Sequence, residues 1–294
     1  MRPPRINLSH LITFYFVAKL KSYREASEQL FITQPAVSMQ IRAFERQFGI
    51  KLFARKDREL TLTKTGEEIF PLAEELYNSA ISCEKFLTDI KNYEEGELKL
   101  GVSRTLSLFI TKYITIFKER FPGIKIILNE GSTKDIMNGL ENFSFDLAIV
   151  SQYPHSSKIK TRKLSEEEMI FVSSPESPLS EKKELRVADL DGENFILPGT
   201  GSGTRMNILR IFEEENISPH IVAEVDNPQT IKRLVMGNRG ISLMFPPLIE
   251  EELKKGLIVR LPIRGKISID VELAYNAKPP TPHKIKAFLE ILTS

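Results

Sequence analysis

Residues 7–30 carry apolar positions at helical spacing in two short blocks. Between residues 7 and 17 the apolar side chains recur every three or four positions, with Asn7 and Ser9 as candidate N-caps. Ser22 and Glu25 then form an S-x-x-E capping box, which is typical of a helix start. The pattern therefore predicts two short helices, of which the second ends near residue 30.

A third helix is predicted to begin after Thr33. The threonine is a good N-cap, and a proline in the first turn costs little because its missing N–H has no helical partner there. Val37, Ile41 and Phe44 recur on an inner face, so the polar side chains of this helix lie on the other side. Two short helices with a tight turn, the second with a polar outer face, indicate a helix-turn-helix.

Polar residues on the outer face of this helix suit the major groove of DNA. Glutamine can pair with adenine, arginine with guanine or phosphate, and serine with either. Two short alternating stretches around residues 49–63 then predict a hairpin wing whose arginines would reach a phosphate backbone. An ordinary solvated helix face is the alternative interpretation. The candidate DNA contacts are Thr33, Gln34, Pro35, Ser38, Met39, Arg42, Arg55 and Arg58.

The charge distribution along the chain supports a polyanionic partner at one end. Residues 1–65 contain 12 Lys and Arg against 5 Asp and Glu, a net charge of +7. The remainder contains 29 against 34, a net charge of −5. A basic head on an acidic body favours nucleic acid binding by the head, with a chance surface imbalance as the alternative.

A narrow apolar seam follows the wing. Thr65 and Glu68 suggest another capping box, and an early Pro71 removes one helical hydrogen bond. Apolar residues then recur at alternating intervals of four and three. Such a seam favours a dimerisation helix, although a helix lying on its own core is the alternative. The seam consists of Ile69, Ala73, Leu76, Ala80, Cys83, Leu87 and Ile90, and Cys83 is expected to be a small buried hydrophobe.

Strand-like and helix-like patterns alternate through the rest of the chain. This alternation predicts α/β architecture with a parallel sheet, first over about residues 97–165 and again over about 166–267. A hinge or crossover is expected at residues 173–175, and residues 268–294 are expected to return to the first lobe. The fold class is multidomain: an α-helical winged helix-turn-helix at 1–65, a linker helix at 66–92, and an α/β domain of two Rossmann-like lobes at 93–294.

Hydroxyl-bearing residues and arginines follow several of the predicted strands. Ligands in such folds bind at the carboxyl ends of strands, in the crevice between lobes. Hydroxyls, helix-start N–H groups and arginines together favour a carboxylate or an inorganic oxyanion, although each Ser or Thr alone is also a helix N-cap. The candidate anion-binding residues are Ser103, Arg104, Thr105, Ser132, Thr133, Ser202, Thr204, Arg205 and Asn227.

The glycine-rich stretch LPGTGSGTR, residues 197–205, raises the alternative of a nucleotide-binding enzyme. Its spacing matches neither a P-loop nor G-x-G-x-x-G, because Thr204 stands where the second motif needs its third glycine. The sequence shows no catalytic triad, metal-ligand spacing or cofactor motif, so a non-enzyme without metal or cofactor is expected. A transport binding protein is disfavoured by the basic head and by the lack of a recognisable signal peptide. No apolar run reaches membrane-spanning length, which predicts a cytoplasmic protein.

The run ASEQLFITQPAVSMQIRAFERQFGIKLFARKDRELTLTKTG, residues 26–66, resembles the winged helix-turn-helix of LysR-type transcriptional regulators, and the similarity continues through the body. Met39, and Tyr23 with Arg24, depart from residues common in the family, which bears on the bases that are read. The resemblance implies a sequence-specific regulator that binds double-stranded DNA as a homodimer or homotetramer. It also implies a small effector bound between two periplasmic-binding-protein-like lobes, and RNA polymerase as a further partner.

Overall fold

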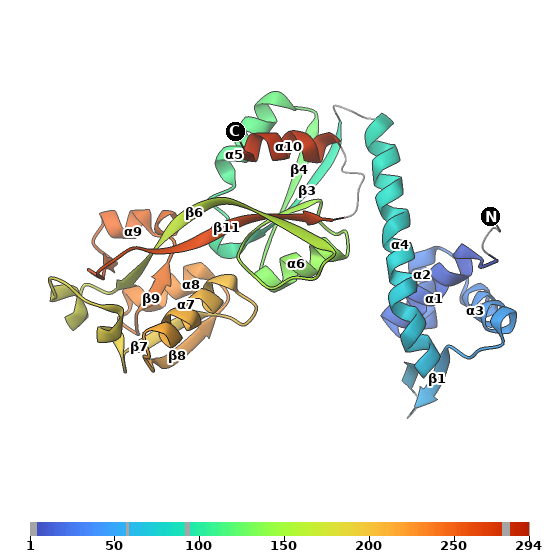
Figure 1. Cartoon of the computed structure of the whole chain (residues 1–294), viewed down its shortest axis with the longest axis horizontal. Helices are drawn as coiled ribbons and strands as arrows, with labels where there is room; N and C mark the ends of the chain where they lie inside the picture. Colours follow the sequence, from blue (N-terminus) through green and yellow to red (C-terminus); the bar gives the residue numbers. More distant parts are fainter. Residues whose placement is uncertain (1–4, 57–58, 92–94, 278–282, 294) are drawn as a thin grey trace. The chain divides into compact units, whose positions relative to one another are not determined.

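The computed structural model describes residues 5–56, 59–91, 95–277 and 283–293. The chain divides into two units, Met1–Lys85 and Phe86–Ser294. The first unit contains three short helices, a two-stranded hairpin and the start of a long helix (Figure 1). Its elements are α1 (Leu8–Leu20), α2 (Tyr23–Leu30), α3 (Gln34–Phe48), β1 (Phe53–Lys56), β2 (Glu59–Leu62) and α4 (Lys64–Lys91).

The predicted caps start the three short helices. The side chains of Asn7, Ser22 and Thr33 accept hydrogen bonds from the backbone N–H groups of Ser9, Glu25 and Ala36 at 2.9, 3.2 and 3.3 Å. These helices bury a common core, and the wing contributes to it through the segment that leads into β1. The core includes Phe14, Tyr15, Val17, Val37, Ile41, Phe44 and Leu52, all at most 2% exposed.

The predicted cap of the long helix is wrong by two residues. Thr63, not Thr65, caps α4, because its hydroxyl accepts the Gly66 N–H at 3.0 Å and donates to the Lys51 carbonyl at 2.6 Å. Gly66 lies directly against the carbonyl of Leu52, where any side chain would collide with the backbone. This close approach joins the first turn of α4 to the strand entry of the wing.

The apolar seam of α4 has two different environments. Ala73 is buried in the core of the first unit and Ile69 packs against it. Farther along the helix, Leu76 and Leu87 are 45% and 60% exposed. Cys83 is exposed as well, so the expectation that it is buried is wrong for the single chain.

The second unit is built on two long antiparallel strands, β6 (Ile159–Ser173) and β11 (Ile267–Asn276), which run through both lobes (Figure 1). One lobe adds β3 (Gly96–Ser103), β4 (Ile124–Gly131) and β5 (Leu147–Ser151), giving the order β6-β11-β5-β3-β4. The β3 strand pairs with β4 and β5 in parallel, whereas β11 pairs with β5 and β6 antiparallel. The predicted α/β fold is confirmed, but its sheet is mixed rather than parallel because distant strand β11 enters it.

Helices cover both faces of the first lobe's sheet. Since successive residues of a strand point to opposite sides, strand β5 contributes side chains to two separate apolar clusters. Leu147 and Ile149 of β5 pack in one cluster with Phe117 and Phe288, whose rings lie 5.1 Å apart. Ala148 and Val150 pack in another cluster. The helices of this lobe are α5 (Thr111–Arg120), α6 (Thr133–Glu141) and α10 (His283–Thr293), and a 3-10 turn covers Arg104–Leu106.

The second lobe contains a parallel pair of strands and an extension of β6. The pair is β7 (Asn194–Pro198) with β8 (His220–Val225), while β9 (Ser242–Met244) and β10 (Val259–Arg260) pair antiparallel with β6. Its helices are α7 (Gly203–Glu214), α8 (Pro228–Met236) and α9 (Glu250–Lys254), with 3-10 turns at Pro178–Glu181, Val187–Leu190 and Pro246–Leu248. The glycine-rich stretch LPGTGSGTR therefore connects the end of β7 to the start of α7.

Candidate functional site

The outer face of α3 presents the residues that the sequence assigned to DNA. Gln34, Pro35 and Arg42 are exposed, Ser38 is half-buried, and Met39 is 70% exposed. Opposite them, the inner face of α3 is fully packed, which fixes the orientation of the helix. These side chains other than Met39 line a groove between α3 and the wing, together with Tyr23, Phe53, Ala54 and Leu60.

Glu45 ties α3 to the wing. One of its carboxylate oxygens accepts the Leu52 N–H at 2.9 Å, and the other accepts Lys51 Nζ at 2.9 Å. The residue is 7% exposed, so these two donors compensate for the burial of its charge. The sequence analysis did not single out Glu45, although a carboxylate directly after an inward-facing phenylalanine was a signal for such a buried contact.

The remaining candidate DNA contacts differ in what the structure says of them. Thr33 is the N-cap of α3, and its hydroxyl is engaged with Ala36. Arg55 belongs to β1, but its side chain is not described, and Arg58 lies outside the described residues.

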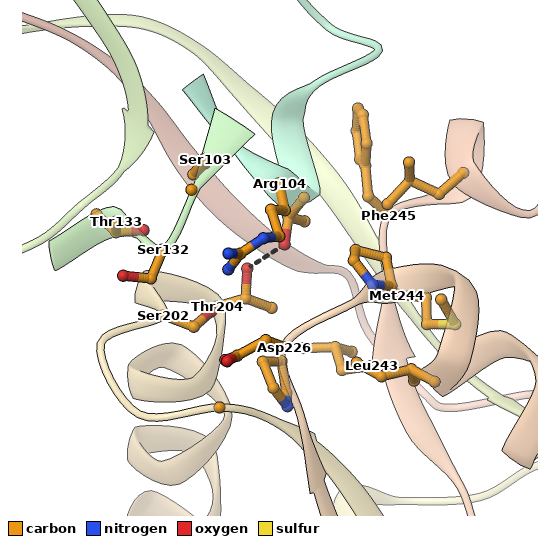
Figure 2. Close-up of a pocket in the computed structure, with 17 residues that line it drawn as sticks. Ser103, Arg104, Ser132, Thr133, Ser202, Thr204, Asp226, Leu243, Met244 and Phe245 are labelled. Carbon is orange, nitrogen blue, oxygen red and sulfur yellow. Dashed lines mark hydrogen bonds between the residues drawn. The ribbon is translucent and has the colours of Figure 1, made fainter. Parts of the chain in front are cut away.

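A small cavity of about 30 Å³ lies where the two lobes of the second unit meet (Figure 2). We call it the interlobe cavity. Seven of the nine predicted anion-binding residues line it, and they come from the ends of β3, β4 and β7. These seven are Ser103, Arg104, Thr105, Ser132, Thr133, Ser202 and Thr204.

Hydrogen bonds join the lobes at one edge of the interlobe cavity. Thr204 Oγ1 donates to Thr105 Oγ1 at 3.1 Å, drawn as the dashed line in Figure 2. The Gly203 N–H donates to Thr133 Oγ1 at 3.1 Å, and the Lys134 N–H donates to the Gly201 carbonyl at 2.9 Å. The glycines of LPGTGSGTR therefore carry the contact between the lobes.

Glycine is required in this loop by close approach rather than by phosphate. A side chain at Gly203 would collide with Ser151 Oγ, and one at Gly199 would collide with the carboxylate of Asp226. Gly201 adopts φ +88°, a left-handed conformation that side chains disfavour. The lack of a side chain at Gly199 thus leaves room for Asp226 at the cavity. The lack of side chains at Gly201 and Gly203 allows the close contact between the lobes.

One polar group in the interlobe cavity lacks a partner. Ser103 is 4% exposed, and its Oγ makes no hydrogen bond within the described residues. A buried hydroxyl without a partner is costly unless a ligand or water satisfies it. Arg104 lies beside it among the cavity-lining residues, and no ion pair of its guanidinium occurs within the described ranges (Figure 2).

Two predicted site residues do not line the cavity. Arg205 instead donates to Glu224 at 2.6 Å and to the Pro198 carbonyl at 3.0 Å, which turns its guanidinium toward β8 and the end of β7. Asn227 caps α8 by accepting the Gln229 N–H at 2.8 Å. Ser132 and Ser202 are N-caps too, of α6 and α7, but they remain on the cavity wall.

The sequence analysis missed part of the cavity wall. Asp226 is one residue before the predicted Asn227, so it also follows the end of strand β8. The apolar side of the cavity comes from the end of β9 and from α8 and the turn after β9. These residues are Ile231, Leu243, Met244, Phe245 and Leu248. The rule that ligands meet strand ends applied to β9 as well and would have found Met244 and Phe245.

The described part of the chain offers no group of three or more histidine, cysteine, aspartate or glutamate residues arranged to hold a metal ion. Within the same residues, no helix is long and apolar enough to cross a membrane.

Comparison with known proteins identifies the class to which both units belong. The protein-family model described as "Bacterial regulatory helix-turn-helix protein, lysR family" matches residues 8–67. A second family model, described as "LysR substrate binding domain", matches residues 91–294. The chain therefore belongs to the LysR family of transcriptional regulators, and the predicted regulatory, non-enzymatic role is confirmed.

Individual relatives extend over most of the chain. The RuBisCO operon transcriptional regulator of Allochromatium vinosum is 28% identical over 88% of this chain and 86% of its own length. The effector binding domain of QuiR in complex with shikimate is 26% identical, covers 68% of this chain and 96% of that one, and has a TM-score of 0.62. The regulatory domain of Synechocystis PCC6803 CcmR in complex with 2-PG is 24% identical over 68% and 96% of the two chains, with a TM-score of 0.63.

Proposed function

We propose that α3 of this regulator enters the major groove of double-stranded DNA and that the wing contacts the adjacent phosphates. The exposed polar face of α3 and the groove between α3 and the wing support this assignment. Gln34 and Ser38 read bases, Arg42 reads guanine or holds phosphate, Pro35 and Met39 make apolar contacts, and Thr33, Arg55 and Arg58 meet phosphate. The target sequence is set by this combination of side chains.

Salt titration of duplex binding tests the DNA assignment. The affinity of the full chain for its operator should fall steeply with salt, and Arg42→Ala should weaken binding and reduce the slope by about 1 if the arginine meets phosphate. Arg120→Ala, an exposed charge on α5, is the matched control and should change neither quantity. An Arg42→Ala variant with unchanged affinity at every salt concentration would exclude this residue from the interface.

For the second unit, we propose that the interlobe cavity binds a small organic or inorganic anion. The observation that carries this proposal is the buried Ser103 hydroxyl, which has no hydrogen-bond partner among the described residues and lies in a cavity that Arg104 also lines. An anion would accept hydrogen bonds from both groups, and the cavity hydroxyls would add further donors. The Asp226 carboxylate on the opposite wall favours a ligand that also carries a hydroxyl, which can donate to it.

Calorimetry and thermal shift with defined anions test the effector assignment. Shikimate and 2-PG, which occupy two related domains, are the first probes, with sulfate as the inorganic probe and chloride as the ionic-strength control. Arg104→Gln should weaken binding at least about tenfold, and Ser103→Ala somewhat less. Arg239→Gln, an exposed charge elsewhere on the same lobe pair, should bind like the unmodified chain. If probes bind equally to Arg104→Gln, the anion does not lie in this cavity.

A dimer held by α4, assembling further into a tetramer, completes the proposal. Exposed leucines along the seam beyond Ala73 support pairing of two copies of this helix. Leu76→Glu should dissociate the assembly in sedimentation experiments, whereas Ser82→Glu, which lies about 120° round the helix from Leu76, should not. An effector in the interlobe cavity would then alter the placement of the DNA-binding heads and the bending of DNA. In this proposal the protein acts in the cytoplasm and contacts RNA polymerase.

A further inference from the structure

A second space between the lobes lies beside α7 and has different chemistry from the interlobe cavity. It measures about 480 Å³, and we call it the α7 groove. One lobe contributes the connection after β5 together with Thr161 and Glu272, and the other lobe contributes one face of α7. We propose that the α7 groove binds a small zwitterion of the amino-acid type, whose ammonium group meets Glu272 and whose carboxylate meets Arg210.

Glu272 supplies an acceptor with no partner of its own. Its carboxylate is partly buried on β11, yet within the described residues it accepts no hydrogen bond and forms no ion pair. Burial raises the pKa of Glu272, while the neighbouring imidazole of His155 opposes this shift and Asp270 adds to it. A cationic donor placed in the groove would relieve the cost of this buried charge.

Arg210 is held over the groove by a buried side chain. Asn207 is 9% exposed, its Nδ2 donates to the Gly203 carbonyl at 2.9 Å, and its Oδ1 accepts Arg210 at 3.3 Å. Within the described residues, the one ion pair of the guanidinium is a long, exposed pairing with Glu214 at 3.8 Å. Most guanidinium donors are therefore available to a carboxylate, in a geometry that one buried asparagine fixes.

The rest of the groove lining is mixed, with Gln152, His155 and Thr161 as polar members. Tyr153, Pro154 and Met206 line the same groove, and Met206 is 41% exposed. An anion alone would not pair with the Glu272 carboxylate, and a simple amine would not pair with the Arg210 guanidinium. A molecule with both charges would pair with both groups, and an apolar side chain would pack on Tyr153, Pro154 and Met206, which is the chemistry of an apolar α-amino acid.

The α7 groove and the interlobe cavity share the first turn of α7. Ser202 and Thr204 face the cavity, whereas Met206 and Asn207 face the groove. Both ligands would bridge the same two lobes, so each should change the affinity for the other by the same factor. This coupling, but not the groove site itself, rests on the proposed effector function.

Binding of L-amino acids to the full-length chain tests the proposal. A panel of the common L-amino acids is screened by thermal shift and calorimetry, and the tightest binder is compared with its amide and with the acid that lacks the amine. The zwitterion should bind, and both analogues should bind at least about tenfold more weakly. Absence of binding across the panel, or equal binding of the deaminated acid, would overturn the proposal.

Isosteric variants locate the site. Glu272→Gln and Arg210→Gln should each weaken amino-acid binding by about tenfold or more. Glu213→Gln and Arg239→Gln, which are exposed and do not line the groove, are the matched controls. Arg104→Gln, in the interlobe cavity, should leave amino-acid binding intact, so failure of the effector proposal remains distinguishable. Amino-acid binding that survives both groove variants would refute the assignment.

Discussion

Gly203→Ala is the most direct test of how the lobes are joined. The added methyl group would overlap Ser151 Oγ and would lie 3.2 Å from the Gln152 carbonyl and 3.3 Å from Ser151 Cβ. Ser151 is 1% exposed, so its hydroxyl has no solvent into which to move. Overpacking of this kind costs about 1–3 kcal/mol, and the better helix propensity of alanine at the start of α7 offsets at most about 1 kcal/mol.

Combining Gly203→Ala with Ser151→Ala gives a double-mutant cycle that measures this contact. The Ser151 hydroxyl has no hydrogen-bond partner within the described residues, so its removal alone should be neutral or stabilise by up to about 1 kcal/mol. In the double variant the overlap disappears, and the closest remaining contact is the tight 3.2 Å to Gln152. Most of the loss caused by Gly203→Ala should therefore be recovered, giving a coupling energy of about 1–2 kcal/mol.

Thermal and urea unfolding of the four proteins measure the cycle. The second unit of the Gly203→Ala variant should melt about 2 to 8 °C lower, and the double variant should return most of that difference. Gly237→Ala, whose methyl group would meet only ordinary contacts of 3.4 Å or more, is the control and should be tolerated. Additive effects of Gly203→Ala and Ser151→Ala would refute the inferred contact.

Three further predictions concern buried or half-buried charges. Glu45→Ala should destabilise the first unit by about 1–3 kcal/mol in urea unfolding, and Glu45→Gln by less, because the amide still accepts a backbone N–H. Burial is the largest single influence on Glu252 and works to raise its pKa, but the hydrogen bonds from Lys232 and the backbone, together with the charges of Lys232 and Lys255, outweigh it and lower the pKa from 4.5. Its contribution to stability is present above pH 4.5 and lost below, so melting temperatures of Glu252→Gln and the unmodified chain should converge in acid. Arg205→Gln should lower the melting temperature through loss of the Glu224 pair without changing anion binding, and lost binding would return Arg205 to the site.

Local signals in the sequence predicted the elements well because their causes are local. Asn7, Ser22, Thr33, Ser132 and Ser202 each cap the helix that follows. Such a cap depends only on a side chain and on backbone N–H groups two or three residues later, so the sequence contains all its determinants. Strand ends also predicted most of the cavity wall, because the ends of parallel strands meet at one edge of a sheet.

Pairings between distant segments were not predictable in the same way. The sheet is mixed because β11 pairs with β6 over registers such as Ile269 with Glu167, about a hundred residues apart. Arg205 was assigned to the anion site from its residue type, but its partner is set by the parallel register that places Glu224 opposite Leu197. A charged side chain near a site is therefore a ligand candidate only after its ion pairs within the protein are known.

The glycine loop shows how one composition can serve two different chemistries. In a phosphate loop, glycines expose backbone N–H groups to a ligand. Here the N–H of Gly203 is bonded to Thr133, and the absent side chains admit Asp226 and Ser151 instead. In the proposed anion site, recognition would therefore fall to the side chains around the loop, chiefly Arg104 and the Ser103 hydroxyl. Since the loop joins the lobes, a ligand bound at these side chains would act on the same contact that positions α7.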